Sequence, residues 1–173
     1  IKTPALRSVI RHVQPACVRL GNGSGVNLAA QGKILTAAHV AGSLDNKLSA
    51  EFPDGRKFTA RCTAIDNELD LAFCTIDCRE RLPHVRIAAA APAAQDRVVC
   101  IGQPGTKTPD GEPTDYQPFH VSVGKIRGFV GDPLGNQTLG RTKHDAWTYW
   151  GHSGSPLFDE HGHIVALHNS WDS

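Results

Sequence analysis

The chain has 173 residues, of which 40% are hydrophobic, enough for one compact domain or two small packed lobes. A formal net charge of +1, without any basic stripe, argues against binding to nucleic acid or to a membrane surface. No apolar run is long enough for a transmembrane helix and no signal-peptide pattern opens the chain, so we expect a soluble protein and leave its compartment open.

Short strands joined by tight turns dominate the first half of the sequence. Glycine and proline are frequent, at 17 and 11 residues, and long runs of strong helix formers are missing. The segment Pro53-Asp54-Gly55 predicts a hairpin turn, and Ala72, Cys74 and Ile76 alternate onto one face of a later strand. We expect a first antiparallel barrel with strands at 16–20, 25–29, 33–37, 48–52, 57–61 and 70–76.

An alanine-rich stretch at 87–94 separates two sets of predicted strands. Its composition favours a helix, but Pro83 and Pro92 favour a linker that runs over the surface. The architecture that we predict is therefore all-β, with two antiparallel barrels side by side, in lobes 1–85 and 86–173. The strands expected in the second lobe are 98–101, 120–130, 148–150, 156–158 and 164–168.

The cysteines give no clear indication of the compartment. There are five of them, so at least one is free or paired outside the chain. Cys62, Cys74 and Cys100 stand in apolar, strand-like runs. We expect these three to be small buried hydrophobic residues rather than reactive thiols.

A glycine-flanked serine within residues 151–156 is the most specific chemical signal. A serine nucleophile needs a tight turn, because its Oγ must project from the backbone and nearby amides must face the oxyanion of the tetrahedral intermediate. In this interpretation Gly151 and Ser153 supply the two N–H groups, and Gly154 removes bulk beside the attacking oxygen. We predict Ser153 as a nucleophile, although similar strings also occur in ordinary turns.

Two further segments supply the partners that such a serine requires. His39 follows an apolar strand and two small residues, and Asp70 opens another apolar strand. Each residue alone is often structural, but with Ser153 they occur in the chain order histidine, aspartate, serine. We predict that His39 takes the Ser153 proton, and that Asp70 holds the imidazole tautomer and stabilises its cation.

The chain resembles the chymotrypsin-like serine proteases. The resemblance rests on Gly23-Ser24-Gly25, the stretches 34–40 and 151–157, and Asp70-Leu71-Ala72, and it extends over about residues 16–171. Within that group the layout is most similar to HtrA-type proteases and glutamyl endopeptidases. The resemblance implies two antiparallel six-stranded barrels, a serine endopeptidase that acts on a protein or peptide, and no cofactor or metal.

Some residues depart from the pattern of the animal enzymes. Val40 stands where animal trypsins have a cysteine directly after the histidine, so that disulfide is absent. His152 stands where animal zymogens have the aspartate that pairs with a new N-terminal amine, so we expect no activation through Ile1. The resemblance also implies a last strand and a helix after Ser173.

The resemblance also gives an expectation about substrate specificity. Trp147 occupies the place of the trypsin aspartate that attracts basic side chains, which argues against cleavage after lysine or arginine. Thr148 and His168 match the threonine or serine and the histidine that bind a substrate carboxylate in glutamyl endopeptidases. A hydroxyl and an imidazole both donate hydrogen bonds to a carboxylate. We expect acidic specificity through Thr148, His168, Asn169 and Ser170.

Other functions remain open on the sequence alone. An HtrA-like enzyme would prefer small aliphatic residues, and a pseudoprotease would keep the barrels as a binding module without turnover. The esterase alternative is weak, because Ser153 lacks a strand–elbow–helix context. His161 and His163 suggest a metal site, but their spacing fits a surface hairpin equally well, and no other ligand cluster supports a metal. The oligomeric state stays open.

Overall fold

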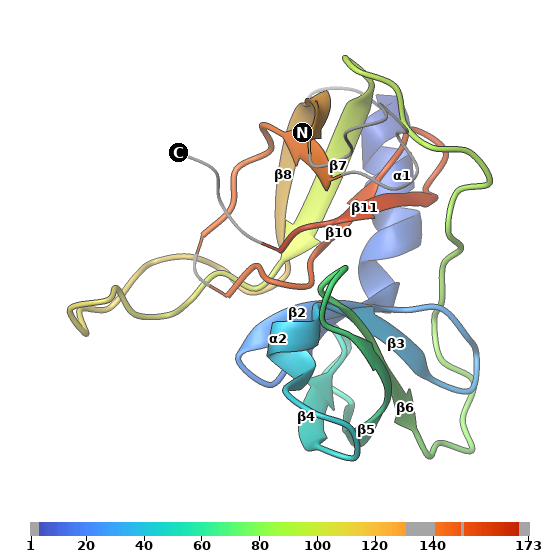
Figure 1. The fold of residues 1–173 in the computed structure, drawn as a ribbon, viewed down its shortest axis with the longest axis vertical. Helices are drawn as coiled ribbons and strands as arrows, with labels where there is room; N and C mark the ends of the chain where they lie inside the picture. The colour runs from blue at the N-terminus through green and yellow to red at the C-terminus, as the bar shows by residue number, and fades with distance from the viewer. Residues whose placement is uncertain (1–3, 131–140, 150, 170–173) are drawn as a thin grey trace.

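Six antiparallel strands close into a barrel, which forms the lower half of the molecule in Figure 1. The computed structural model describes residues 4–130, 141–149 and 151–169. The strand order around the barrel is β1-β2-β3-β6-β5-β4, which confirms the first barrel expected from the sequence. Its strands are β1 (Cys17–Leu20), β2 (Gly23–Asn27), β3 (Lys33–Thr36), β4 (Lys47–Glu51), β5 (Lys57–Asp66) and β6 (Leu71–Ile76).

Local sequence signals account for the barrel hairpins. The turn between β4 and β5 closes where the Phe52 N–H donates to the Arg56 carbonyl at 2.9 Å, and Gly55 adopts a φ of 92° that favours glycine. In β6 the side chains of Ala72, Cys74 and Ile76 are buried and alternate with half-buried ones, as predicted. These side chains join a core that fills the barrel with Val18, Leu20, Ile34, Ala41, Ala50, Phe52, Ala60, Cys62 and Leu82.

The second lobe is an open sheet rather than the expected six-stranded barrel. Its order is β11-β10-β7-β8-β9. Within the described residues β9 pairs only with β8, and beyond β10 the strand β11 has only an isolated parallel bridge from Ile164 to Ile87, so the sheet does not close. The strands are β7 (Arg97–Gly102), β8 (His120–Val130), β9 (Arg141–His144), β10 (Pro156–Phe158) and β11 (Ile164–Leu167).

The strand pattern of this lobe differs from the prediction in two places. Strand β9 was not predicted, and the strand expected at 148–150 is absent at 148–149, while Trp150 lies outside the described residues. The backbone turns there instead, because the His152 N–H donates to the Tyr149 carbonyl at 3.0 Å.

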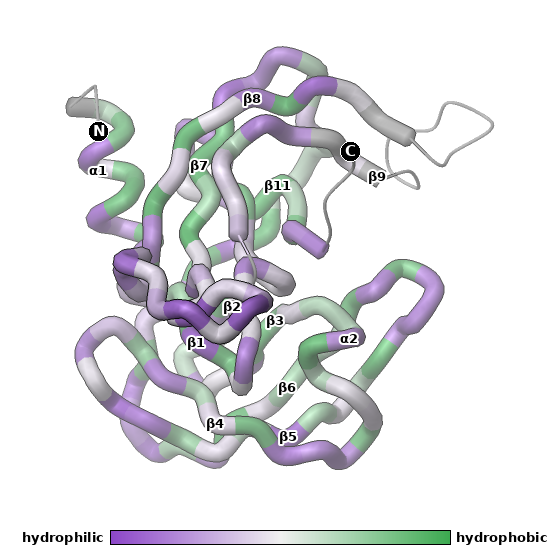
Figure 2. The backbone as a smooth tube through the Cα atoms, turned by 90° about the vertical axis from the view of Figure 1, so that its left-hand side faces the viewer, coloured by the Kyte–Doolittle hydropathy of each residue, from purple (hydrophilic) through white to green (hydrophobic). Residues whose placement is uncertain are grey.

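An N-terminal helix is the main departure from the all-β expectation. Helix α1 (Pro4–Val13) runs into a short 3₁₀ turn, Gln14–Ala16, and lies beside the second sheet in Figure 1. Leu6, Ile10 and Val13 recur at helical spacing and are buried. They share a core with Val85, Val99, Ile101, Phe158 and Ile164. Figure 2 shows that β7 is hydrophobic along most of its length, and its Val99 and Ile101 belong to this core.

The alanine-rich segment forms a linker, as the prolines predicted. Residues 88–96 contain no helix or strand, and the chain is tied to the second sheet where the Ala88 N–H donates to the Ile164 carbonyl at 2.8 Å. The lobe boundary between residues 85 and 86 stays a prediction. No helix in the described ranges is long and apolar enough to cross a membrane.

All five cysteines are free thiols. Cys62, Cys74 and Cys100 are buried, as expected. Burial is the main cause that raises the pKa of Cys74 and of Cys100 to about 12. Both thiols therefore stay protonated and unreactive at neutral pH.

Candidate active site

Strand pairing in the barrel brings His39 and Asp70 together. His39 lies in α2 (Ala38–Ala41), just after β3, and Asp70 directly precedes β6, which pairs with β3. The Asp70 carboxylate accepts the His39 backbone N–H at 3.0 Å through Oδ1 and contacts His39 Nδ1 at 2.8 Å through Oδ2. Asp70 has a φ of 55°, a left-handed conformation that aspartate tolerates better than most residues. Asp70 therefore fixes His39 through both carboxylate oxygens, one at its backbone and one at its ring.

The turn that contains Ser153 docks onto the barrel. The Ser24 N–H of β2 donates to the Ser153 carbonyl at 2.8 Å, and the Ser24 hydroxyl donates to the Gly151 carbonyl at 2.9 Å. From the second sheet, the Gly154 N–H donates to the His168 carbonyl at 2.8 Å. The turn is thus fixed between the two lobes from both sides.

Two glycines allow this close approach. Gly154 has a φ of 87° and Gly151 a φ of 98°, which L side chains rarely adopt. A Cβ at Gly154 would collide with the Ser24 carbonyl, and one at Gly151 would collide with the Gln103 carbonyl. The glycine-flanked pattern therefore serves backbone packing as well as access to the serine.

Ser153 lies next to the segment that carries His39. A Cβ built on Gly23 would lie 2.7 Å from the Val40 side chain and 3.0 Å from the Ser153 carbonyl, so Gly23 separates the residue after His39 from the serine. The Ser153 hydroxyl donates to the Asn169 carbonyl at 3.4 Å. Within the described part of the chain no hydrogen bond joins it to His39.

The turn also carries two backbone donors without acceptors. Neither the Gly151 N–H nor the Ser153 N–H donates to an acceptor in the described ranges. Unpartnered amides in a tight turn are what an oxyanion site requires. The assignment of an oxyanion site to Gly151 and Ser153 stays a prediction.

His168 is buried and contacts a second histidine. Its side chain is 6% exposed, and its Nδ1 lies 3.1 Å from Nε2 of His144. Burial is the main cause that lowers the pKa of His168 to about 3, and electrostatic repulsion between its imidazolium form and those of neighbouring histidines adds to it. Burial also lowers the pKa of His144. Both rings are therefore neutral at pH 7.

His152 supports the serine turn from inside the second lobe. It is fully buried, and its Nδ1 accepts the Tyr149 N–H at 3.0 Å. Burial lowers the pKa of His152 to about 4. Trp147 packs edge-on to its ring, with centroids 5.6 Å apart, and stacks on Tyr149 at 6.2 Å. An aromatic cluster therefore surrounds Trp147, the residue that the resemblance places at the trypsin aspartate.

The other residues singled out in the sequence are Thr148, Asn169, Ser170, His161 and His163. Thr148 and Asn169 are half-buried, and Ser170 lies outside the described residues. His161 and His163 sit in the turn between β10 and β11, where both of their backbone N–H groups donate to Asp159 Oδ1 at 2.9 Å. No group of three or more histidine, cysteine, aspartate or glutamate side chains suited to a metal occurs in the ranges that the structure describes.

Sequence reasoning missed two residues that shape the site. Ser24 is buried and also accepts the Gln103 N–H at 2.9 Å, so it links three segments; its place in a Gly-Ser-Gly string was the only signal. His144 was not singled out, because nothing in the spacing between residues 144 and 168 indicates that their rings meet.

The buried histidines make the folded state sensitive to acid. In the folded protein the pKa values of His152 and His168 are about 4 and 3, below the ordinary value of 6.5. At any pH between the folded pKa and 6.5, the unfolded chain therefore binds more protons than the folded protein. Stability is therefore complete above pH 6.5 and falls as the pH falls. We expect the free energy of unfolding in urea to drop by about 2 kcal/mol per histidine from pH 7 to 5.

A variant separates this effect from the carboxylates, which stay mostly ionised in that range. His168→Gln should lose the contribution of His168, about 2 kcal/mol between pH 7 and 5, while His163→Gln, which replaces an exposed histidine, should behave as the parent. Equal stability of the parent at pH 7 and pH 5 would show that these rings take up protons without unfolding.

Comparisons with known proteins show which family the chain is similar to. The family model of the trypsin-like peptidase domain matches residues 23–167, which include His39, Asp70 and Ser153. Serine protease HTRA2, mitochondrial, of Bos taurus is 30% identical over 151 residues, covering 87% of this chain and 31% of that protein. Serine endoprotease DegS of Escherichia coli is 29% identical over 185 residues, covering 96% and 49%. The chain thus spans between about a third and a half of these relatives.

Proposed function

The chain belongs to the trypsin-like peptidase domain family, with relatives of the HtrA type, and we propose that it hydrolyses peptide bonds as a serine endopeptidase. The observation that carries this proposal is the pair of hydrogen bonds that Asp70 accepts from His39, beside the turn of Ser153. Its substrate is a protein or peptide, and its triad is His39, Asp70 and Ser153.

Ser153, His39 and the backbone amides of the turn each take part in a step of the proposed reaction. In the free protein the Ser153 hydroxyl points at the Asn169 carbonyl, and rotation about χ1 turns it to His39 when substrate binds. His39 Nε2 then takes the proton while Oγ attacks the carbonyl carbon. The oxyanion receives hydrogen bonds from the Gly151 and Ser153 amides. His39 returns its proton to the leaving amine, and water hydrolyses the acyl-enzyme by the same route.

Asp70 acts on His39 in two ways. Its Oδ2 faces Nδ1 of the imidazole, so the Nδ1 proton stays in place and Nε2 keeps a free lone pair for the serine proton. The imidazolium that forms after proton transfer is stabilised by the same carboxylate, because a full negative charge then lies 2.8 Å from the ring nitrogen.

For specificity, we propose that the enzyme prefers glutamate before the scissile bond, bound through Thr148, His168, Asn169 and Ser170. The Gly154 N–H donates to the His168 carbonyl and the His168 N–H donates to the Ser155 carbonyl, both at 2.8 Å, which supports a location of His168 near the reacting centre. A carboxylate buried without hydrogen-bond donors would cost several kcal/mol. His168 supplies such a donor even when neutral.

The contact with His144 sets the tautomer of His168. His144 Nδ1 is buried and has no hydrogen-bond partner in the described residues. A buried nitrogen lone pair without a partner costs less free energy than a buried N–H without one. The His144 proton therefore sits on Nε2 and not on Nδ1, and this N–H is donated to His168 Nδ1. The His168 proton is then on Nε2, and this N–H is the donor to the substrate carboxylate.

A matched peptide series tests this specificity. Peptides that differ only in the residue before the scissile bond are given to the parent and to His168→Ala. We expect kcat/KM after glutamate to fall by about 30- to 150-fold, because one charge-assisted hydrogen bond is lost, and cleavage after alanine or leucine to change little.

The control is His163→Ala, which removes an exposed histidine from the β10–β11 turn. It should retain the preference of the parent. A parent that prefers alanine or valine, together with an unchanged His168→Ala, would make His168 a packing residue and support the small aliphatic specificity instead.

A further inference from the structure

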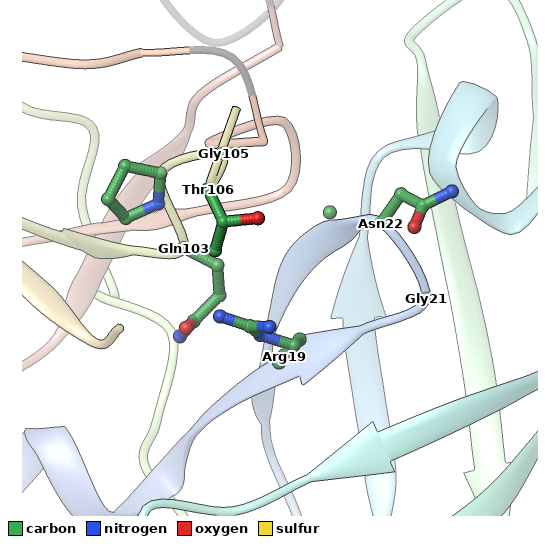
Figure 3. A pocket seen from close by; sticks show the side chains of 8 residues that line it. Arg19, Gly21, Asn22, Gln103, Gly105 and Thr106 are labelled. Carbon is green, nitrogen blue, oxygen red and sulfur yellow. The ribbon is translucent and has the colours of Figure 1, made fainter. Parts of the chain in front are cut away.

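A polar pocket with a volume of about 110 Å³ lies beside the serine turn. Figure 3 shows its lining, which comes from the turn between β1 and β2 and from the loop after β7. Gly23 belongs to this lining and contacts the Ser153 carbonyl. Across the pocket, Gln103 and Gly105 approach Gly151. The pocket therefore adjoins the predicted nucleophile from the barrel side.

The pocket presents hydrogen-bond donors that lack acceptors. The Arg19 side chain forms no hydrogen bond or ion pair in the described residues. Gln103 is 3% exposed, and its Nε2 is buried without a partner, while its Oε1 accepts the Phe119 N–H at 3.0 Å. In Figure 3 the two side chains converge at the base of the pocket, with Thr106 above them.

No carboxylate balances this charge within the pocket. Its lining consists of Arg19, Gly21, Asn22, Gly23, Gln103, Pro104, Gly105 and Thr106. Glu51 stands opposite Arg19 in the register of β1 and β4, but the two side chains form no ion pair within 4.0 Å in the described ranges. The Arg19 guanidinium is the one charged group of this lining and favours an anionic ligand, and a carboxylate fits its N–H donors.

The position of the pocket suits the part of the substrate that follows the scissile bond. Thr148 and His168, proposed to bind the residue before the scissile bond, come from the second lobe, whereas Arg19 and Gly23 come from the barrel. A peptide with its scissile carbonyl at Ser153 extends away from the first of these places as it continues past the bond. Its next residues advance about 3.3 Å each, and the pocket is within their reach because Gly23 of its lining lies beside the Ser153 carbonyl.

We propose that this pocket binds an acidic side chain at the first or second residue after the scissile bond, with Arg19 as the specificity-determining cation. The proposal rests on the proposed endopeptidase activity. It adds a second preference for an acidic substrate residue, on the leaving-group side of the bond. This preference is separate from the one for glutamate before the bond, which is assigned to His168.

The test uses peptides that share the best residue of the parent before the bond and carry glutamate or glutamine at either of the two following positions. We expect the parent to prefer glutamate by about tenfold at one of them, and Arg19→Gln to reduce this to less than about twofold. The preference should shrink with added salt, because the pocket is open to solvent. Arg79→Gln, an exposed arginine beyond the far end of β6, should leave it unchanged.

A small anilide substrate separates the two proposals, because it has no amino acid after the scissile bond. Arg19→Gln should cleave it as fast as the parent. Absence of any anilide or peptide cleavage would contradict the endopeptidase proposal itself. The pocket is then tested by fluorescence anisotropy with the same peptides, which should bind more weakly with glutamine. Equal kcat/KM values, or equal Kd values, for the glutamate and glutamine peptides would overturn the assignment of Arg19.

Discussion

Replacing Ser153 by alanine is expected to reduce kcat/KM for peptide hydrolysis by about 10⁴- to 10⁶-fold. The hydroxyl is the attacking group, and without it only substrate binding and the two backbone amides of the turn remain. The fold should persist, because the hydrogen bonds that dock this turn use the carbonyl of Ser153 and the hydroxyl of Ser24, and neither is altered. Peptide cleavage and thermal unfolding of parent and variant measure both expectations.

The neighbouring Ser155 provides a matched control. It is buried, and its hydroxyl has no hydrogen-bond partner in the described part of the chain, so Ser155→Ala leaves no buried group unpaired. A fluorophosphonate probe should label the parent and Ser155→Ala but not Ser153→Ala. Near-normal cleavage by Ser153→Ala would end the triad assignment, and a parent that is neither labelled nor active would be a pseudoprotease.

Replacing Asp70 by asparagine is expected to lower kcat by about 10⁴-fold at neutral pH. The amide oxygen would take over the hydrogen bond from the His39 N–H, which leaves the amide NH₂ facing His39 Nδ1. That arrangement places the imidazole proton on Nε2, where it blocks acceptance of the serine proton. Asparagine also tolerates the left-handed backbone at this position, so stability should change little.

Asp66→Asn is the control in the same turn. Asp66 Oδ1 accepts the N–H groups of Glu68 and Leu69 at 3.0 Å, and the oxygen of asparagine serves equally well. This variant should keep the activity of the parent. If Asp70→Asn stayed within tenfold of the parent, Asp70 would not be the residue that orients His39.

Signals confined to a few neighbouring residues were enough for part of the fold. The hairpin at Pro53-Asp54-Gly55 follows from turn chemistry, and the linker at 87–94 from prolines that outweigh alanine propensity. The alternating burial in β6 was predictable for the same reason, whereas closure of the barrel also needs the pairing of β1 with β4, which are distant in the chain. Helix α1 has a proline at its start and a helical apolar spacing, yet that short signal was overlooked.

The sequence alone determined the residue types and the chain order of the predicted triad, because a nucleophile, a base and a carboxylate leave recognisable local strings around His39, Asp70 and Ser153. The open second sheet, the contact of His144 with His168 and the pocket at Arg19 depended on the tertiary structure. These features join segments far apart in the chain, and their approach depends on how the barrel packs against the sheet. No short stretch of sequence contains both partners of such a contact.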